Sequence, residues 1–199
     1  MKKQLLIGLF VCAIVPAAMS QISGGVRLGA NIANQKFDAE GLSISPDSKL
    51  GLLGGLYLTA SLSDKIGIQP ELYFSSMGSK LDVQGFESTT KLNYLSLPVL
   101  VRYNFTENIS LQAGPQLGFL LSAKGEVDGT SEDIKDSFKG LDLGAAIGLG
   151  VDFGPFNGGL RYVLGLANTS DESDPDGGDF TVKNNSLQIF VGYRLFGGK

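Results

Sequence analysis

The side chains that most often carry enzyme chemistry are nearly absent from this chain. Its 199 residues include no histidine, and its one cysteine is Cys12. Without histidine there is no Ser-His-Asp triad and no histidine-ligated metal. Cys12 lies in a segment that we expect to be removed, so the mature chain has no thiol nucleophile. The sequence therefore predicts that the protein is not an enzyme, that it has no catalytic residues and that it binds no cofactor.

Carboxylates are dense in one segment, which runs from Asp171 to Asp179 and could offer oxygen ligands to calcium. Its spacing does not match an EF-hand loop, and Pro175 interrupts it. We therefore predict a solvated loop and no metal site. The segment 123–140 is acidic as well, and one weaker hypothesis is that both loops bind divalent cations that bridge surface lipids.

The first twenty residues have the composition of a secretory signal. Lys2 and Lys3 precede an apolar stretch, and Ala18-Met19-Ser20 offers small residues before a cleavage site. We expect a cleaved signal peptide at 1–20 and one mature domain at 21–199. Removing both lysines leaves 14 basic against 20 acidic residues, a net charge of −6. That charge argues against nucleic acid as a partner.

Apolar residues in the mature chain recur with a period of two. From Leu141 to Phe153 every second residue is apolar, and the residues between them are glycine, alanine or aspartate. This alternation is typical of β-strands with two different faces. Eight segments share it: 26–33, 50–62, 66–77, 93–105, 109–122, 141–153, 160–167 and 186–195.

The second face of these strands carries arginines, so the two faces must be assigned. An eight-stranded barrel has an interior just wide enough for side chains, and lipid requires an apolar exterior. We predict an all-β fold, an eight-stranded antiparallel up-and-down transmembrane β-barrel; a soluble lipocalin-like barrel is the alternative. Short connections (63–65, 106–108, 154–159) alternate with long ones (34–49, 78–92, 123–140, 168–185), which predicts periplasmic N- and C-termini and external long loops.

Three prolines fall inside predicted strands, at Pro70, Pro98 and Pro115. Each lacks a ladder donor, so we expect bulges or local irregularities there.

All four mature arginines lie on the predicted inner face, together with two carboxylates. We predict a charge network that plugs the lumen; an ion- or proton-conducting path is the alternative reading of buried charge. Asp142 lies nearer the external end and is expected to stand apart. The network residues are Arg27, Glu71, Arg102, Asp152, Arg161 and Arg194.

Aromatic residues occur on the outer face near the predicted periplasmic ends of the strands. Such rings favour the membrane interface. We predict a girdle made of Tyr103, Phe105, Phe153, Tyr162 and Tyr193.

The motifs Gln69-Pro70-Glu71-Leu72-Tyr73, Leu92-Asn93-Tyr94-Leu95-Ser96-Leu97-Pro98 and Gly192-Tyr193-Arg194-Leu195-Phe196 complete this picture. With them the chain resembles the PorT-like outer-membrane β-barrel family of Bacteroidota, over nearly all of 21–196. The resemblance implies a barrel similar to OmpX and to the transmembrane part of OmpA. Members of the family usually end in Tyr-Arg-Phe, whereas here Leu195 takes the last place and Phe196 follows.

These observations predict a monomeric, integral outer-membrane protein with a structural or surface-interaction role through its external loops. A narrow porin-like channel and an accessory component of a protein secretion system are the alternatives. The expected partners are outer-membrane lipid and lipopolysaccharide, the outer-membrane assembly machinery, and an unknown surface or secretion partner.

Overall fold

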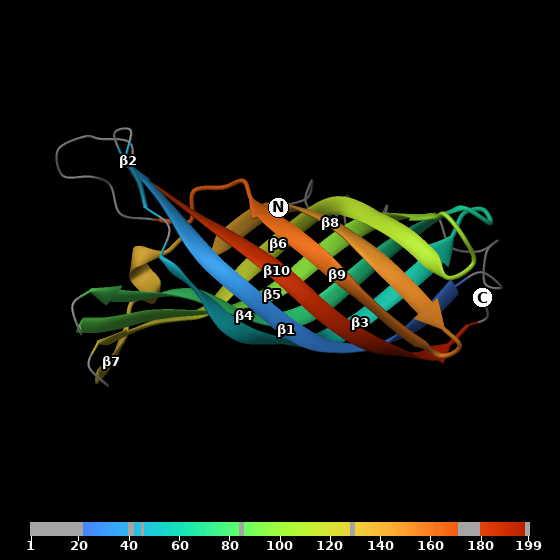
Figure 1. The fold of residues 1–199 in the computed structure, drawn as a ribbon, viewed down its shortest axis with the longest axis horizontal. Helices are drawn as coiled ribbons and strands as arrows, with labels where there is room; N and C mark the ends of the chain where they lie inside the picture. The colour runs from blue at the N-terminus through green and yellow to red at the C-terminus, as the bar shows by residue number, and fades with distance from the viewer. Residues whose placement is uncertain are drawn as a thin grey trace, which may run out of the picture.

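The computed structural model describes residues 22–39, 42–44, 46–83, 86–127, 130–170 and 180–197. Eight long strands dominate these residues (Figure 1). They are β1 (Ile22–Ala39), β3 (Asp47–Ser61), β4 (Ile66–Val83), β5 (Phe86–Asn104), β6 (Ile109–Val127), β8 (Leu141–Phe153), β9 (Phe156–Gly165) and β10 (Phe180–Phe196). The predicted signal peptide and the acidic segment 171–179 lie outside the described residues.

The eight strands form a closed antiparallel ring. Each long strand pairs with the long strand that follows it in sequence, and β10 pairs with β1 to close the ring. The closing register runs without a break from Gly25 opposite Arg194 to Ala39 opposite Phe180. The predicted eight-stranded up-and-down barrel is confirmed, and Figure 1 shows the strands winding obliquely around the long axis.

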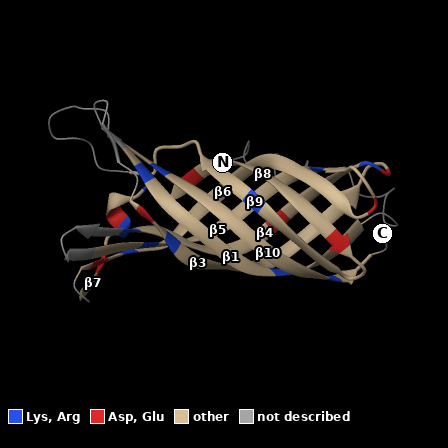
Figure 2. Ribbon diagram, viewed as in Figure 1, with Lys and Arg blue, Asp and Glu red and all other residues tan. Residues whose placement is uncertain are grey.

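The alternation of apolar and polar residues in the sequence corresponds to the outer and inner faces of this ring, because successive side chains of a strand point to opposite faces. Leu28, Leu52 and Val191 are 66%, 72% and 68% exposed, while inward neighbours such as Asn31 and Gln188 are at most 1% exposed. A wall with leucine, isoleucine and valine outside and amides inside matches lipid on one side and a polar lumen on the other. Figure 2 shows the barrel wall almost free of charge, with charged residues concentrated toward its two ends.

Tight turns join the strands at one end of the barrel. In the β3–β4 turn the Ser63 Oγ accepts the Ile66 N–H at 3.1 Å, and in the β5–β6 turn the Thr106 Oγ1 accepts the Ile109 N–H at 3.0 Å. These hydroxyls satisfy backbone donors that the turns leave unpaired. β1 begins and β10 ends at this same end, because Gly24 lies opposite Phe196.

The other end is more regular than the sequence indicated. The predicted long loop 78–92 is largely strand, because β4 continues to Val83 and β5 begins at Phe86. Two short strands, β2 (Leu42–Ile44) and β7 (Thr130–Asp133), and a 3₁₀ turn, η1 (Lys135–Ser137), occupy other predicted loops. These extensions project from the barrel in Figure 1. Among the described residues, no helix has the length and apolarity needed to cross a membrane.

The three prolines interrupt the ladder without shifting it. β4 and β5 keep one register on both sides of Pro98, from Pro70 opposite Val99 to Tyr73 opposite Ser96. The pairs between these two rungs are missing, and comparable gaps occur beside Pro70 and Pro115. The expected local irregularity is therefore present, but the expected bulges are not, because a missing N–H removes a hydrogen bond without inserting a residue. The register shifts occur elsewhere, at Gly24/Gly25, Ser48/Leu53 and Asn93/Tyr94.

Candidate functional site: the barrel lumen

The lumen is filled by layers of side chains that can be followed along β4. Its inward positions, two residues apart, are Gln69, Glu71, Tyr73 and Ser75, and Met77 continues the series toward the long-loop end. All five are at most 4% exposed. Each contributes to a different layer, so β4 gives the order of the layers from the tight-turn end to the long-loop end.

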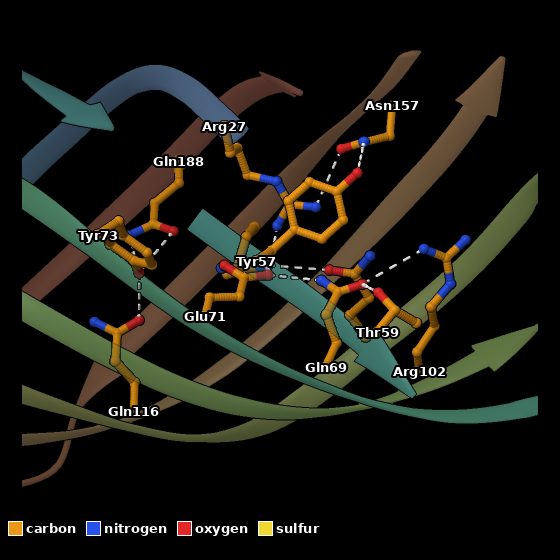
Figure 3. A network of polar contacts seen from close by, with 12 residues as sticks. Arg27, Tyr57, Thr59, Gln69, Glu71, Tyr73, Arg102, Gln116, Asn157 and Gln188 are labelled. Carbon is orange, nitrogen blue, oxygen red and sulfur yellow. Dashed lines mark hydrogen bonds and ion pairs between the residues drawn. The ribbon is translucent and has the colours of Figure 1, made fainter. Parts of the chain in front are cut away.

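The central layer is an ion cluster around Glu71. Arg161 on β9 binds its carboxylate with both terminal nitrogens, Nη1 to Oε2 at 2.8 Å and Nη2 to Oε1 at 2.8 Å. Arg27 on β1 also donates to Oε1 through Nη1, as drawn in Figure 3. The intervening strand β3 carries Gly55 opposite Arg27, which leaves no side chain in the way. Three strands far apart in sequence are thereby tied to one carboxylate.

Amides and aromatic rings complete this layer. Gln69 Nε2 donates to Glu71 Oε1 at 2.6 Å, and Arg161 Nη2 donates to Gln112 Oε1 at 3.1 Å. The Phe190 ring lies 4.2 Å from the Arg27 Cζ and 5.1 Å from the Arg161 Cζ, measured to the ring centroid. Two guanidinium groups and one carboxylate leave one positive charge in excess. Such a charge is attracted to the face of an aromatic ring.

A second ion pair lies closer to the tight-turn end. Arg102 on β5 pairs with Asp152 on β8, and its Nε donates to Asn104 Oδ1 at 2.9 Å. The two charged side chains are 13% and 19% exposed, against 1% for Glu71 and Arg161. Gln69 links the pair to the central layer, because its Oε1 accepts from Arg102 Nη1 at 3.5 Å (Figure 3). Asn157 accepts from Arg27 Nη2 at 3.2 Å and donates to the Tyr57 hydroxyl at 2.7 Å.

Below this pair the lumen widens into a vestibule of about 530 Å³. Turn residues such as Ser63, Glu107 and Pro155 line it, so it lies at the tight-turn end. Arg194 lines the vestibule as well. It is the predicted network residue that stands apart, because its Nη2 donates to the Gly154 carbonyl at 2.9 Å rather than to a carboxylate. Its strand ends two residues later, which leaves it at the rim.

The layers above Glu71 combine hydrogen-bonded amides with apolar side chains. The Tyr73 hydroxyl donates to Gln116 Oε1 at 2.8 Å and accepts from Gln188 Nε2 at 3.1 Å. Beyond these residues an apolar cluster lies at the long-loop end of the lumen, with Ile134 and Phe138 packed against it from the β7–η1 segment. The cluster consists of Ala33, Met77, Leu92, Tyr94, Leu120 and Ala123.

Asp142 stands apart from both ion clusters, as expected from its position. Asn184 Nδ2 donates to Asp142 Oδ2 at 2.9 Å and to the Tyr94 hydroxyl at 3.2 Å. The other carboxylate oxygen, Asp142 Oδ1, and the amide oxygen, Asn184 Oδ1, are buried without a hydrogen-bond partner. Both residues line a cavity of about 10 Å³, which is close to the room needed by a single water molecule.

Four of the five predicted girdle residues lie at the tight-turn end, and Tyr162 is the exception. Tyr103 and Phe105 are in edge contact at 5.2 Å, and Phe153 is 80% exposed beside the β8–β9 turn. Phe156, which we had placed in a turn, contacts Tyr193 at 5.4 Å. Tyr162 lies opposite Ile147 and six residues along β9 from Phe156, so it is nearer the middle of the wall than predicted.

Several lumen residues are absent from the predicted network, although the alternation along their strands places them on the inner face. Tyr57, Gln69 and Phe190 lie on the inner face by the same alternation that located the arginines. They carry no formal charge, and the predicted network is defined by charged side chains alone. No group of three or more His, Cys, Asp or Glu side chains gathers within the part of the chain that the structure describes. The arrangement is one of packing, ion pairing and hydrogen bonding.

Known proteins share this architecture. The chain aligns with the attachment invasion locus protein Ail of Yersinia pestis over 87% of its length and 98% of Ail, at 18% identity and a TM-score of 0.51. It aligns with Neisserial surface protein A over 84% of its length and 96% of that protein, at 13% identity and a TM-score of 0.52. These similarities concern the fold. No curated protein sequence matches the chain at a significant level.

Residues 17–171 match the outer membrane protein beta-barrel domain family. That match covers most of the chain, and the lipid-facing wall described above is what such a domain requires. The chain therefore belongs to the outer membrane protein beta-barrel domain family and is an integral protein of the outer membrane.

Proposed function

We propose that the protein is a closed, non-conducting and non-enzymatic barrel that acts through the surface of its external end. The observation that carries this proposal is the filled lumen. The ion cluster at Glu71, the Tyr73 layer and the apolar cluster follow one another along the axis. An ion crossing the barrel would have to displace packed side chains at each layer.

Planar-bilayer recording tests the closed barrel against the narrow-channel alternative. We expect purified protein to give no steady conductance steps in 1 M KCl. A variant with Arg27→Ala, Glu71→Ala and Arg161→Ala loses the central ion cluster but keeps the apolar cluster, so we expect it to remain closed as well. Steady, well-resolved steps from the unaltered protein would overturn the proposal.

We further propose that both termini and the tight turns face the periplasm. This orientation is supported by the contrast between the two ends, because short periplasmic turns and longer external connections are the rule in this class of barrel. Protease added to intact cells should cut a recognition site inserted after Asp133 but leave a tag after Lys199 intact. Cleavage of the C-terminal tag in intact cells would reverse the orientation.

The assignment to the PorT-like branch, and with it an accessory role in protein secretion, stays a prediction. It is supported by the motifs around Glu71 and in 92–98. If it holds, gentle solubilisation of native membranes should recover the barrel with a stable protein partner. Recovery of the barrel alone, as a monomer, favours the structural and surface role. In both cases the assembly machinery of the outer membrane is expected to bind the chain during insertion.

The external end also supports contact with lipopolysaccharide. Lysines project from the strand ends there, including Lys36, Lys80, Lys124 and Lys183. Figure 2 shows blue positions gathered at this end of the barrel. Phosphate groups of the outer leaflet are the anions that such lysines would meet first.

A further inference from the structure

Asp142 differs from the other carboxylates of the lumen in its lack of a cation. Glu71 and Asp152 are each paired with arginine. Asp142 is only 8% exposed, yet among the residues that the structure describes neither an arginine nor a lysine pairs with it. Moving an ionised carboxylate out of water is costly unless it is paired or coordinates a metal ion. Asp142 therefore needs either a proton or a counter-charge from outside the described chain.

A cavity of about 10 Å³ adjoins this carboxylate, and both Asp142 and Asn184 line it. Asn184 Nδ2 donates to Asp142 Oδ2 at 2.9 Å and to the Tyr94 hydroxyl at 3.2 Å, which fixes the amide and turns its Oδ1 away from both. Asp142 Oδ1 and Asn184 Oδ1 are the atoms that find no partner within the described chain. Both are acceptors, so neither can satisfy the other while Asp142 is ionised.

The size of the cavity and the chemistry of these two oxygens favour a small monovalent ion. The cavity has room for about one particle of the size of water. Carboxylate and amide oxygens are hard ligands for metal ions, but calcium takes about 6–8 of them, and one carboxylate balances one charge. A water molecule could donate to both oxygens but would leave the negative charge uncompensated. Gly118, Gly144 and Gly165 also line the cavity, so no side chain occupies that part of its wall.

The cavity lies where the wall between β8 and β10 ends. The β8–β9 ladder stops at Gly144 opposite Gly165, and Asp142 lies two residues beyond it on β8. Its hydrogen bond with Asn184 on β10 therefore joins two strands that are not neighbours in the ring. Gln116 of the layer below also lines the cavity. An ion arriving from the long-loop end would reach the two free oxygens without passing that layer.

We propose that Asp142 Oδ1 and Asn184 Oδ1 bind one dehydrated monovalent metal cation, sodium or potassium, at the long-loop end of the lumen. The cation neutralises the buried carboxylate and joins β8 to β10 beyond the end of β9. The site is separate from the surface role proposed above, and it is compatible with a closed barrel because it holds an ion without passing it across the membrane.

Urea unfolding in lipid vesicles, with sodium, potassium or choline chloride at equal ionic strength, tests the site. Choline is too large for a cavity of this size and serves as the reference cation. A ligand that binds only the folded state multiplies the folding equilibrium constant by 1 + [ion]/Kd, which is about elevenfold at ten times the Kd. We expect a rise of this form with sodium, with potassium or with both, and the larger rise identifies the ion that fits better.

Two variants separate the site from a general effect of salt. Asp142→Asn removes the charge at nearly constant volume and should give the same folding constant in all three salts. In choline chloride, where the carboxylate has no counter-charge, this variant should be more stable than the unaltered protein. Asp152→Asn is the matched control, because it removes a lumen carboxylate that is paired with Arg102. It should keep the full rise with sodium or potassium.

The side-chain amide of Asn184 locates the ion directly. Its NMR resonances, recorded on the folded barrel in detergent micelles, should shift when choline is replaced by the effective cation, and they should not shift in Asp142→Asn. Equal folding constants in the three salts would overturn the site and leave Asp142 protonated or bound to water. A rise that persists in Asp142→Asn, or an Asn184 amide that does not respond, would place the ion elsewhere and overturn the site as well.

Discussion

Glu71 is the side chain on which most of the lumen depends. Its Oε1 accepts from Arg27, Arg161 and Gln69, and its Oε2 accepts from Arg161. Desolvating three charges is costly, so the cluster is not itself evidence of high stability. Loss of one member is nevertheless strongly destabilising, because the remaining charges stay buried without compensation.

Glu71→Gln should therefore destabilise the barrel by about 3–5 kcal/mol. The change keeps the volume and one acceptor oxygen but leaves two guanidinium groups in the lumen. Urea unfolding in lipid vesicles, followed by tyrosine fluorescence, measures the effect. Glu107→Gln, in the exposed β5–β6 turn, is the control and should change stability by less than about 0.5 kcal/mol.

Replacing the whole cluster should cost far less than breaking it. Arg27→Met/Glu71→Leu/Arg161→Met removes all three charges at similar volume, and such swaps are often neutral or stabilising. Urea unfolding in the same vesicles should give this triple variant a higher free energy of unfolding than Glu71→Gln. A triple variant less stable than Glu71→Gln would show that the ion pairs themselves hold the strands together.

Asp142 presents the opposite case, a buried carboxylate bound to an amide. Asp142→Asn keeps an acceptor for Asn184 Nδ2 and adds a donor that can reach the unpartnered Asn184 Oδ1. We expect a gain in unfolding free energy of about 1 kcal/mol, the size of one net hydrogen bond. A loss of similar size would mean that the carboxylate has a donor in the adjoining cavity, such as a bound water.

At the level of elements, β4 and β5 are longer than a bilayer needs. A transmembrane strand takes about 9–11 residues, while β4 has 18 and β5 has 19. The excess lies at the long-loop end, where Lys80 still pairs with Thr89 and Ser79 with Thr90. This projecting hairpin belongs to the surface that faces the cell exterior in our proposal.

Shortening that hairpin should leave the barrel intact. Replacing 80–89 with Asn-Gly joins Ser79 to Thr90, which are already register partners, through a turn suited to hairpins. We expect folding yield and urea stability to change little, since the removed residues lie beyond the apolar band. Failure of the shortened chain to fold would assign the projection a role in assembly rather than at the surface.

The elements also show where sequence reasoning succeeded and where it stopped. Alternation located all eight long strands and the inward arginines, because lipid outside and a narrow lumen inside impose a strict period of two. It cannot locate the strand ends beyond the membrane, where no lipid enforces the pattern, and the prediction therefore places 78–92 in a loop. The predicted position of Tyr162 along the barrel axis is wrong, because alternation gives the face on which a residue lies but not its distance from the turns.

Partners within the lumen were harder to predict than faces. That Arg161 rather than Arg194 meets Glu71 depends on strand stagger around the ring, which links residues 90 apart in sequence. Composition and period contain no such information. Phe190 illustrates the same limit, since its contact with two arginines follows only from the closed ring.

The whole molecule depends on one seam, the pairing of β1 with β10. A disulfide across it reports closure directly, because residues 21–199 contain no cysteine of their own. Asn34→Cys/Asn185→Cys joins facing residues and should cross-link on mild oxidation of the folded barrel. In the Asn34→Cys/Ile189→Cys variant the second cysteine lies four residues along β10 from the position that faces Asn34, so this pair should cross-link poorly. Equal cross-linking of both pairs would contradict the register.

The seam also sets the order of events when the protein is made. β1 leaves the ribosome before the other long strands, yet its partner on one side is β10, the last of them, so that edge has nothing to pair with until β10 has been made. The Glu71 cluster must wait as well, since one of its arginines comes from β9. Contacts of such long sequence separation form slowly. We therefore expect a nascent chain that is held open by other proteins and that closes late, in a single cooperative step.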